Sequence, residues 1–420
     1  MTNERETAVD ILMEIEREHG YGGIVLSRSL NRAVALDARA RGLVTEIVNG
    51  CMRNLIWIDY ILDSFSKTPA AVMEPFIRQL LRAAVYQVKF MDRIPISAAV
   101  NEAVKLTRKR GFDGLSGFVN AVLRNIARRE TPLPDRAEGL DRFLCVRYSF
   151  PLWITQYYIS RFGPEEAERI CAAAAKPPRV HICVNTNRIS RDELLNLIEA
   201  GPSGENGAVL AKTSDIAKLK AFQDGLFHVM DGSSMKAAEM LDPKPGEAIM
   251  DLCAAPGGKS FYCAYLMKNR GHIYAWDLHA HRVNLIKDSA RRLGINNLTA
   301  GVADARVFNA AFDSKADRVL IDAPCTGLGA AARKPDIKYR AAQADIHTLA
   351  QTQRDILSAG QRYVKPKGVL VYSTCTLTRE ENEDNAAWFL SRYPFEMETE
   401  TLLLPGESDG FYIAKFVRDG

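Results

Sequence analysis

The sequence predicts a multidomain protein in three parts: an all-α part over residues 1–134, a small α/β part over 135–242, and a doubly wound α/β part over 243–420. Three observations predict this division. Apolar residues repeat at helical spacing through the first part, a proline-rich turn at 131–134 ends that pattern, and strand, turn and helix patterns alternate in the third part. The chain has 420 residues, of which 47% are hydrophobic and 25% charged, so each part can bury a core.

Composition excludes several classes of protein. No apolar run reaches the ~18 residues of a membrane helix, and the first twenty residues are charged rather than signal-like. The eight cysteines are scattered, without a CxxC pair or a Cys/His cluster at zinc spacing. We therefore expect a cytoplasmic protein with no membrane contact, no disulfide scaffold and no metal.

The helical part carries a concentrated positive charge. Helices are expected over 96–108 and 115–129, with another beginning at Pro75. Between Arg78 and Arg129 there are eleven Lys or Arg and three acids, a net charge of +8, so the rest of the chain sums to −4. Charge alone leaves two interpretations open, a surface that attracts phosphate backbones or a solvated helical face.

The middle part has weaker signals. Alternating apolar residues predict a strand over 180–185, and a helix is expected over 191–200. A turn-rich stretch follows at 201–207, with short strands near 208–210 and 226–230. These elements predict a small α/β unit.

The last part predicts a mostly parallel sheet. Short apolar strands separated by helical segments are expected at 248–250, 272–276, 298–303, 318–321 and 369–372. In such sheets ligands bind at the carboxyl ends of the strands. The residues with unusual chemistry follow those ends.

A glycine loop follows the first of these strands. A loop of this kind lets a ligand approach the backbone at a helix N-terminus. Its candidate cofactor-binding residues are Cys253, Ala254, Ala255, Pro256, Gly257, Gly258 and Lys259. A P-loop needs glycine at the position of Cys253, which disfavours a nucleotide triphosphatase, and the dinucleotide pattern GxGxxG is absent. The loop therefore predicts a cofactor without a pyrophosphate.

Two acids end the next strands in order. Asp277, 19 residues after Gly258, is suited to accept hydrogen bonds from a ribose hydroxyl pair, and Asp304 to face an adenine amino group. Taken singly, each acid is more often a helix cap or a solvated turn residue. Three strand ends in order favour a nucleoside-bearing cofactor without phosphates, which is S-adenosylmethionine.

Two cysteines follow neighbouring strands, Cys325 after Asp322 and Cys375 after Ser373-Thr374. A single cysteine is usually inert and buried, but two at adjacent strand ends suit methylation of C5 of cytosine. A thiolate on C6 makes C5 nucleophilic, a carboxylic group stabilises charge at N3, and a second cysteine serves as the base that removes the C5 proton. No His or Lys adjoins Cys375 in sequence, so nothing there indicates what activates it.

These motifs resemble the RNA 5-methylcytosine methyltransferases. The matching stretches are 251–260, 322–327, 372–377 with Glu381-Asn382-Glu383, 333–338 and 409–415. The resemblance implies that Cys375 is the nucleophile, that Cys325 is needed for product release, and that Asp322 contacts the base beside the cofactor. It also assigns Cys253 to Lys259, Asp277 and Asp304 to the S-adenosylmethionine site. The chain departs from the family pattern at Met230, usually Gln, and at Lys367, usually Gly.

The N-terminal helices, with the sequence of residues 118–124, are similar to the NusB-like RNA-binding domain. Within this family that domain marks the bacterial 16S rRNA methyltransferase B branch, which implies 16S rRNA as partner, cytosine 967 as target and a monomer. Two alternatives stay open: methylation of tRNA, and a non-catalytic RNA-binding assembly or antitermination factor.

Overall fold

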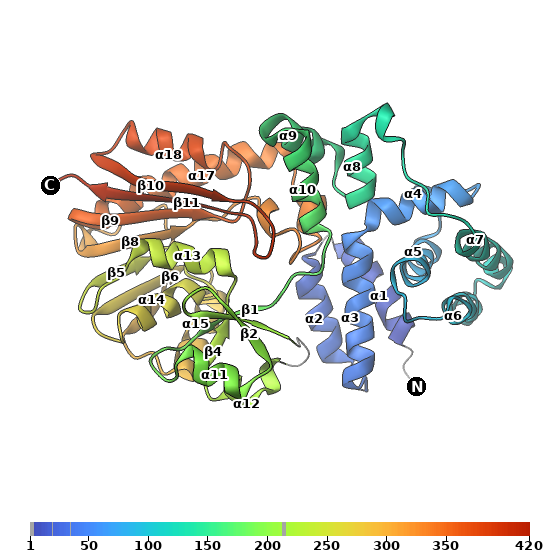
Figure 1. The fold of residues 1–420 in the computed structure, drawn as a ribbon, viewed down its shortest axis with the longest axis horizontal. Coiled ribbons are helices and arrows are strands. Elements are labelled where there is room, and N and C mark those ends of the chain that lie inside the picture. Colours follow the sequence, from blue (N-terminus) through green and yellow to red (C-terminus); the bar gives the residue numbers. More distant parts are fainter. Residues whose placement is uncertain (1–3, 19, 34, 212–215) are drawn as a thin grey trace. The chain divides into compact units, whose positions relative to one another are not determined.

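The computed structural model describes residues 4–18, 20–33, 35–211 and 216–420. Helices fill the first part of the chain, and two separate sheets follow it (Figure 1). No helix within the described ranges has both the length and the apolar character that crossing a bilayer requires.

The chain divides into two compact units. Unit 1 comprises Met1–Pro177 together with Ala331–Arg340, and unit 2 comprises Pro178–Ala330 with Ala341–Gly420. The section expected at 135–242 is therefore shared between the units, because its residues up to Pro177 belong to unit 1 and those from Pro178 onward belong to unit 2.

Unit 1 is helical, as predicted. Its described helices are α1 (Glu4–Glu18), α2 (Gly22–Arg32), α3 (Ala38–Arg53), α4 (Leu55–Phe65), α5 (Pro75–Phe90), α6 (Ile96–Lys109), α7 (Ser116–Arg128), α8 (Leu140–Tyr148), α9 (Leu152–Phe162), α10 (Pro164–Ala174) and α16 (Ile337–Arg340). Pro75 occupies the first turn of α5, where the Glu74 side chain caps the backbone N–H of Ile77. The apolar faces of α1 to α7 bury one continuous core.

The segment Ala331–Arg340 is held inside unit 1 by polar contacts. The Asp336 carboxylate accepts the backbone N–H of Gly22 at 2.9 Å. The Lys338 ammonium donates to the carbonyl oxygens of Arg53 and Tyr148, at 3.0 and 3.1 Å, and burial lowers the pKa of Lys338 to about 7. These contacts satisfy carbonyls at the C-terminal ends of α3 and α8.

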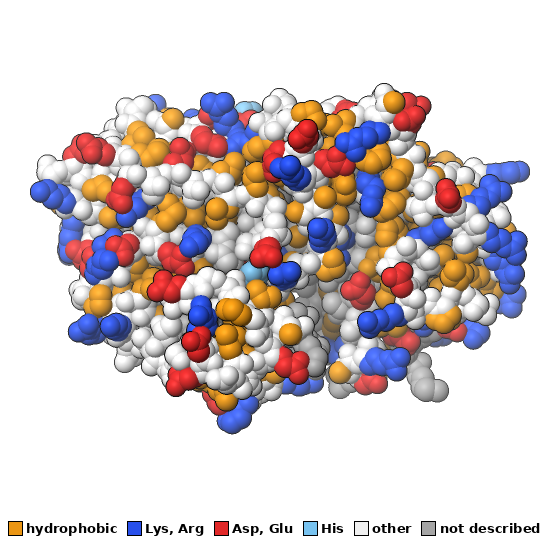
Figure 2. Space-filling view, viewed as in Figure 1, with side chains coloured by type: hydrophobic (Ala, Val, Ile, Leu, Met, Phe, Trp, Pro, Cys, Tyr) orange, Lys and Arg blue, Asp and Glu red, His pale blue; other side chains and the backbone are white. Residues whose placement is uncertain are grey.

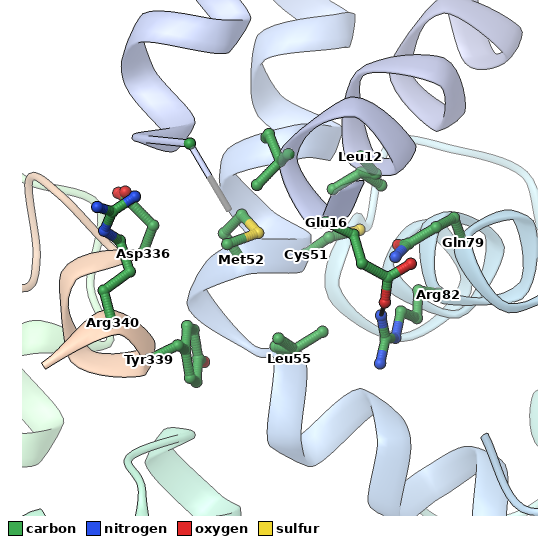
Figure 3. Close-up of a pocket in the computed structure, with 12 residues that line it drawn as sticks. Leu12, Glu16, Cys51, Met52, Leu55, Gln79, Arg82, Asp336, Tyr339 and Arg340 are labelled. Atoms are coloured by element: carbon green, nitrogen blue, oxygen red, sulfur yellow. Dashed lines mark ion pairs between the residues drawn. The ribbon is translucent and has the colours of Figure 1, made fainter. Parts of the chain in front are cut away.

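A cavity of about 450 Å³ lies in unit 1 between α1, α3, α5 and this segment. Figure 3 shows Asp336 and Arg340 at one end and the Glu16–Arg82 ion pair at the other, with Met52 between them. No pattern in the sequence indicated this cavity.

The first sheet of unit 2 is small and antiparallel, with strand order β2-β3-β1-β4. Its elements are β1 (His181–Val184), α11 (Arg191–Leu197), β2 (Ala200–Ser203), β3 (Gly207–Leu210), α12 (Lys220–Gln223) and β4 (Phe227–Val229). The expected helix over 191–200 ends at Leu197, because Ile198 is extended and Ala200–Ser203 pairs with β3 instead. The chain there forms edge strand β2, where a proline is tolerated.

The second sheet of unit 2 has seven strands in the order β10-β11-β9-β8-β5-β6-β7 (Figure 1). The strands from β9 to β7 are parallel, as predicted. The elements are α13 (Gly232–Leu241), β5 (Ala248–Asp251), α14 (Gly258–Leu266), β6 (His272–Asp277), α15 (Ala280–Leu293), β7 (Leu298–Val302), β8 (Ala316–Asp322), α17 (Gln343–Gly360), β9 (Val364–Thr374), α18 (Glu383–Leu390), β10 (Phe395–Leu403) and β11 (Phe411–Arg418). Apolar residues of α13, α14 and α15 pack on one face and those of α17 and α18 on the other.

Strands β10 and β11 were not predicted. They follow one another without an intervening helix and pair antiparallel with each other, and β11 also pairs antiparallel with β9. Lys367, which stands where the family usually has glycine, adopts φ +62 in the irregular start of β9. A glycine would adopt that conformation at lower cost, which explains the usual preference.

Candidate active site

Acidic residues occupy the carboxyl ends of neighbouring parallel strands. Asp251 ends β5, Asp277 ends β6 and Asp322 ends β8, while Asp304 follows β7. Because β9, β8, β5, β6 and β7 are consecutive in the sheet, these groups line one edge. The edge predicted to bind a ligand therefore carries a row of carboxylates.

The two predicted cysteines meet at this edge. Asp322 of β8 pairs with Ser373 of β9, and the chain brings Cys325 and Cys375 together just beyond that pair. Their sulfur atoms lie 3.4 Å apart, and both residues are partly exposed. The hydrogen bond to Cys375 and burial together raise the pKa of the Cys325 thiol well above its usual range. Either sulfur can donate in this hydrogen bond.

Lys259 and Asp322 form an ion pair beside the thiols. The Lys259 ammonium lies 2.7 Å from Asp322 Oδ2, and Ser373 donates its hydroxyl to Asp322 Oδ1 at 3.1 Å. Burial of Lys259 disfavours its charge, but Asp322, Asp251 and Cys375 together raise its pKa. Lys259 was predicted only as a cofactor-binding residue. In the structure Lys259 also interacts electrostatically with Cys375. The spacing of these two residues in the sequence does not indicate this interaction.

The glycine loop is tightly fitted to helix α14. Gly257 has φ +109, and a Cβ there would come within 2.2 Å of the Phe261 ring, so only glycine fits. The Ser260 hydroxyl at the start of α14 donates to Asp251 at 2.6 Å. Burial raises the pKa of Asp251 to about 7, a shift to which the nearby Asp322 carboxylate adds.

The two acids predicted to bind the nucleoside have different surroundings. Asp277 is buried and accepts the backbone N–H groups of Ala255 and His279, which ties the glycine loop to β6. Asp304 is bound by Arg306 at 2.7 Å, and hydrogen bonding from that side chain lowers the pKa of Asp304. Burial also raises the pKa of the Cys253 thiol, which keeps that sulfur protonated within the loop.

This arrangement defines a class of enzyme. A parallel sheet, a glycine loop opening α14, and acids at the ends of β6 and β7 supply backbone donors and carboxylates suited to a nucleoside with an amino acid moiety. The residues present therefore fit S-adenosylmethionine, and the fold and site are those of an S-adenosylmethionine-dependent methyltransferase.

Three family models match parts of the chain. Residues 238–417 match the model described as 16S rRNA methyltransferase RsmB/F, and residues 2–128 match the NusB family. Residues 150–211 match the ferredoxin-like domain described for RsmF/B-like methyltransferases.

Similar proteins cover the whole chain. It is 39% identical to the probable ribosomal RNA small subunit methyltransferase B of Bacillus subtilis, over 100% of this chain and 94% of the relative. It is 34% identical to the Synechocystis protein with the same description, over 99% of each chain. The crystal structure of PH0851 matches 99% of both chains with a TM-score of 0.82 and 27% identity. The chain belongs to the ribosomal RNA small subunit methyltransferase B family.

The buried carboxylate of Asp277 gives the first test of the cofactor site. We expect Asp277→Ala to raise the dissociation constant for S-adenosylmethionine about 10- to 100-fold, since hydrogen bonds to a charged group are removed. Titration calorimetry measures this directly. Asp288→Asn, on the exposed face of α15, is the matched control and should bind normally. Unchanged binding by Asp277→Ala in a folded protein would place the cofactor elsewhere.

Proposed function

We propose that this protein methylates C5 of a cytosine in small-subunit ribosomal RNA, cytosine 967 of 16S rRNA, through a covalent bond between Cys375 and C6. The observation that carries the proposal is the pair of sulfur atoms 3.4 Å apart beside the Lys259–Asp322 ion pair. One pyrimidine ring offers two reacting carbons, C5 and C6, at adjacent positions. Two thiols this close can reach the same ring, so that one sulfur reacts at C6 and the other at C5.

Cys375 makes the first bond. Its thiolate adds to C6, the C5=C6 double bond opens, and its electron pair becomes available at C5. Lys259 interacts electrostatically with Cys375, and a nearby cation favours a thiolate. Asp322, held by Lys259 and Ser373, is proposed to contact the base beside the cofactor. To stabilise the negative charge that develops at N3, its carboxyl group must carry a proton that it can donate to N3.

The glycine loop, Asp277 and Asp304 would hold S-adenosylmethionine, which would supply an electrophilic methyl group for C5. Gly257 allows the close turn, and Asp277 holds the loop through Ala255. Asp304 is proposed to face the adenine amino group.

Cys325 completes the reaction. Removal of the C5 proton reforms the C5=C6 double bond and expels Cys375 as a thiolate. The largest influence raising the pKa of Cys325 is its hydrogen bond to Cys375. Once Cys375 is bonded to C6 that hydrogen bond is lost, which removes one cause of the raised pKa and favours the thiolate form of Cys325 as the base that takes the C5 proton.

RNA contacts are proposed for helices α6 and α7. Of the basic residues counted in the sequence, Arg82 is buried in an ion pair with Asp59, and Arg78 is paired with Glu16. Two more are neutralised on the surface, since Lys109 and Arg110 pair with acids of α1. No acid among the described residues pairs with the exposed side chains of Arg93, Arg108, Arg124 and Arg128. Figure 2 shows Lys and Arg gathered over the α6–α7 region.

Charge reversal tests this surface. We expect Arg108→Glu combined with Arg124→Glu and Arg128→Glu to weaken RNA binding, and to reduce the salt slope of log K by ~0.7 for each RNA phosphate that is no longer neutralised. Filter binding over a salt series measures both. Arg169→Glu, which removes a surface charge already paired with Glu166, is the control. An unchanged slope would assign RNA binding to another surface.

Mapping the modified base tests the proposed function itself. RNA from cells that lack the protein is treated with bisulfite and sequenced, as is the same RNA after incubation with purified protein and S-adenosylmethionine. We expect cytosine 967 to lose protection in the first sample and regain it in the second. Protection that changes only in tRNA would establish the alternative substrate, and no change in either RNA would favour a non-catalytic RNA-binding factor. The enzyme is proposed to act as a cytoplasmic monomer.

A further inference from the structure

Glu381 is a fully buried acid hydrogen-bonded to the residue that follows Cys325, the cysteine proposed to remove the C5 proton. Its carboxylate accepts four hydrogen bonds, all from donors of unit 2. Thr326 supplies two of them, its backbone N–H at 2.9 Å and its hydroxyl at 2.6 Å. Gln353 and the Thr378 hydroxyl supply the others, at 3.0 and 2.5 Å. Since Thr326 directly follows Cys325, Glu381 fixes the loop that carries this thiol.

Asn382 makes the corresponding contacts around the other cysteine. Its side-chain oxygen accepts the hydroxyl of Thr374 at 2.5 Å, and its amide nitrogen donates to the carbonyl of Thr376 at 3.1 Å. Thr374 and Thr376 are the two neighbours of Cys375 in the chain. Asn382 therefore holds the chain on both sides of this sulfur, and is itself fully buried.

The two loops are also joined directly. The hydroxyl groups of Thr326 and Thr376 lie 2.6 Å apart, and the backbone N–H of Gly329 donates to the carbonyl of Cys375 at 3.0 Å. Burying a carboxylate is costly unless its oxygen atoms accept hydrogen bonds. The four donors to Glu381 offset this cost and hold the two loops that carry the cysteines in one conformation. A displacement of either thiol by about 1 Å would misplace it for the proposed reaction, in which one sulfur reacts at C6 and the other at C5 of the same ring.

We propose that Glu381 and Asn382 are positioning residues with separate tasks: Glu381 sets the position of Cys325, and Asn382 sets that of Cys375. The inference rests on the proposed function and deepens it. Removal of the Glu381 hydrogen bonds impairs release of the RNA, and removal of the Asn382 hydrogen bonds impairs attack on C6. Adjacent residues in the chain thus produce opposite kinetic defects.

Adduct measurements separate the two tasks. Glu381→Gln removes the charge with little change of shape, and we expect kcat to fall about 10- to 100-fold, as for a small misplacement of a reacting group. Covalent protein–RNA complex should then accumulate on denaturing gels, because release is the slowed step. Asn382→Ala should lower kcat by a similar factor but accumulate no complex. In a Cys325→Ala background, Asn382→Ala should slow trapping, whereas Glu381→Gln should trap at nearly the rate of Cys325→Ala alone.

Three controls keep the result interpretable. Asp384→Asn removes a carboxylate from the same segment, where it pairs with exposed Arg379, and should behave as wild type. Melting temperature and S-adenosylmethionine affinity are measured for every variant, since general damage to the fold would alter both. If Glu381→Gln or Asn382→Ala fails to fold, Thr326→Val and Thr374→Val remove one hydroxyl hydrogen bond from each residue and carry the same expectations.

The outcomes distinguish this inference from the proposed function. Equal defects in trapping and release for both residues, or activity unchanged in both, would overturn the assignment of separate tasks. Failure of Cys325→Ala to trap RNA, with Cys375→Ala still active, would instead overturn the covalent mechanism. The opposite split, with complex accumulating in Asn382→Ala, would also contradict the assignment.

Discussion

Cys375→Ala is expected to reduce methylation by roughly 10⁴-fold or more, the scale of effect when a catalytic nucleophile is removed. Without a thiolate on C6 the pyrimidine keeps its C5=C6 double bond, and C5 remains too weak a nucleophile to take a methyl group. No covalent protein–RNA complex should form, even after long incubation. Transfer of a labelled methyl group to RNA, followed on the same samples by denaturing electrophoresis, measures both quantities.

A second cysteine provides the control for this effect. Cys145 of α8 lies in unit 1, is partly exposed and has no place in the proposed chemistry. Cys145→Ala should therefore methylate at the wild-type rate. S-adenosylmethionine should bind Cys375→Ala normally, because the glycine loop and Asp277 are unchanged. A Cys375→Ala enzyme that methylates within about tenfold of wild type would show that no covalent step is needed.

Cys325→Ala is expected to convert the enzyme into a trap for its substrate. Cys375 still attacks C6, but the C5 proton has no base to receive it, so the C6–S bond cannot break. Complex should accumulate until most of the enzyme carries RNA, while turnover falls to a small fraction of the wild-type rate. The rate of first methyl transfer, measured under single-turnover conditions, should fall much less than the rate of turnover.

The double variant completes this test. Cys325→Ala combined with Cys375→Ala should form no complex, because the trapped bond belongs to Cys375. Replacement of Cys325 by serine should also trap RNA, since a hydroxyl is a poor base at neutral pH. If Cys325→Ala lost activity without trapping RNA, Cys325 would be required for attack instead of release, and the two sulfur atoms would exchange roles.

The sequence predicted where the candidate site residues lie wherever they end or follow a strand. Asp277 and Asp322 end strands of the parallel sheet, and Cys325 and Cys375 follow neighbouring strands, so sheet topology alone brings them to one edge. The positions of these strands could be predicted because apolar runs and turn residues alternate in this part of the sequence. The helices of the N-terminal part could be predicted for a similar reason, since their apolar residues recur at helical spacing.

The remaining features depend on side chains that meet across long separations. Lys259 reaches Asp322 across 63 residues, and Glu381 reaches Thr326 across 55. No spacing rule connects such pairs, because the fold decides which helix start faces which strand end. The charge count included Arg78 and Arg82, and the sequence does not show that these two side chains pair with acids of unit 1. The motif at 333–338 gave no sign that it would pack within unit 1.

Mass spectrometry of the trapped complex tests the central claim most directly. Cys325→Ala is incubated with rRNA and S-adenosylmethionine, digested with protease and ribonuclease, and its cross-linked peptide is sequenced. The covalent mechanism predicts a cytidine nucleotide bearing one added methyl group, attached to the sulfur of Cys375. A nucleotide attached to any other residue, or a Cys375 peptide recovered unmodified from a fully methylated reaction, would contradict it.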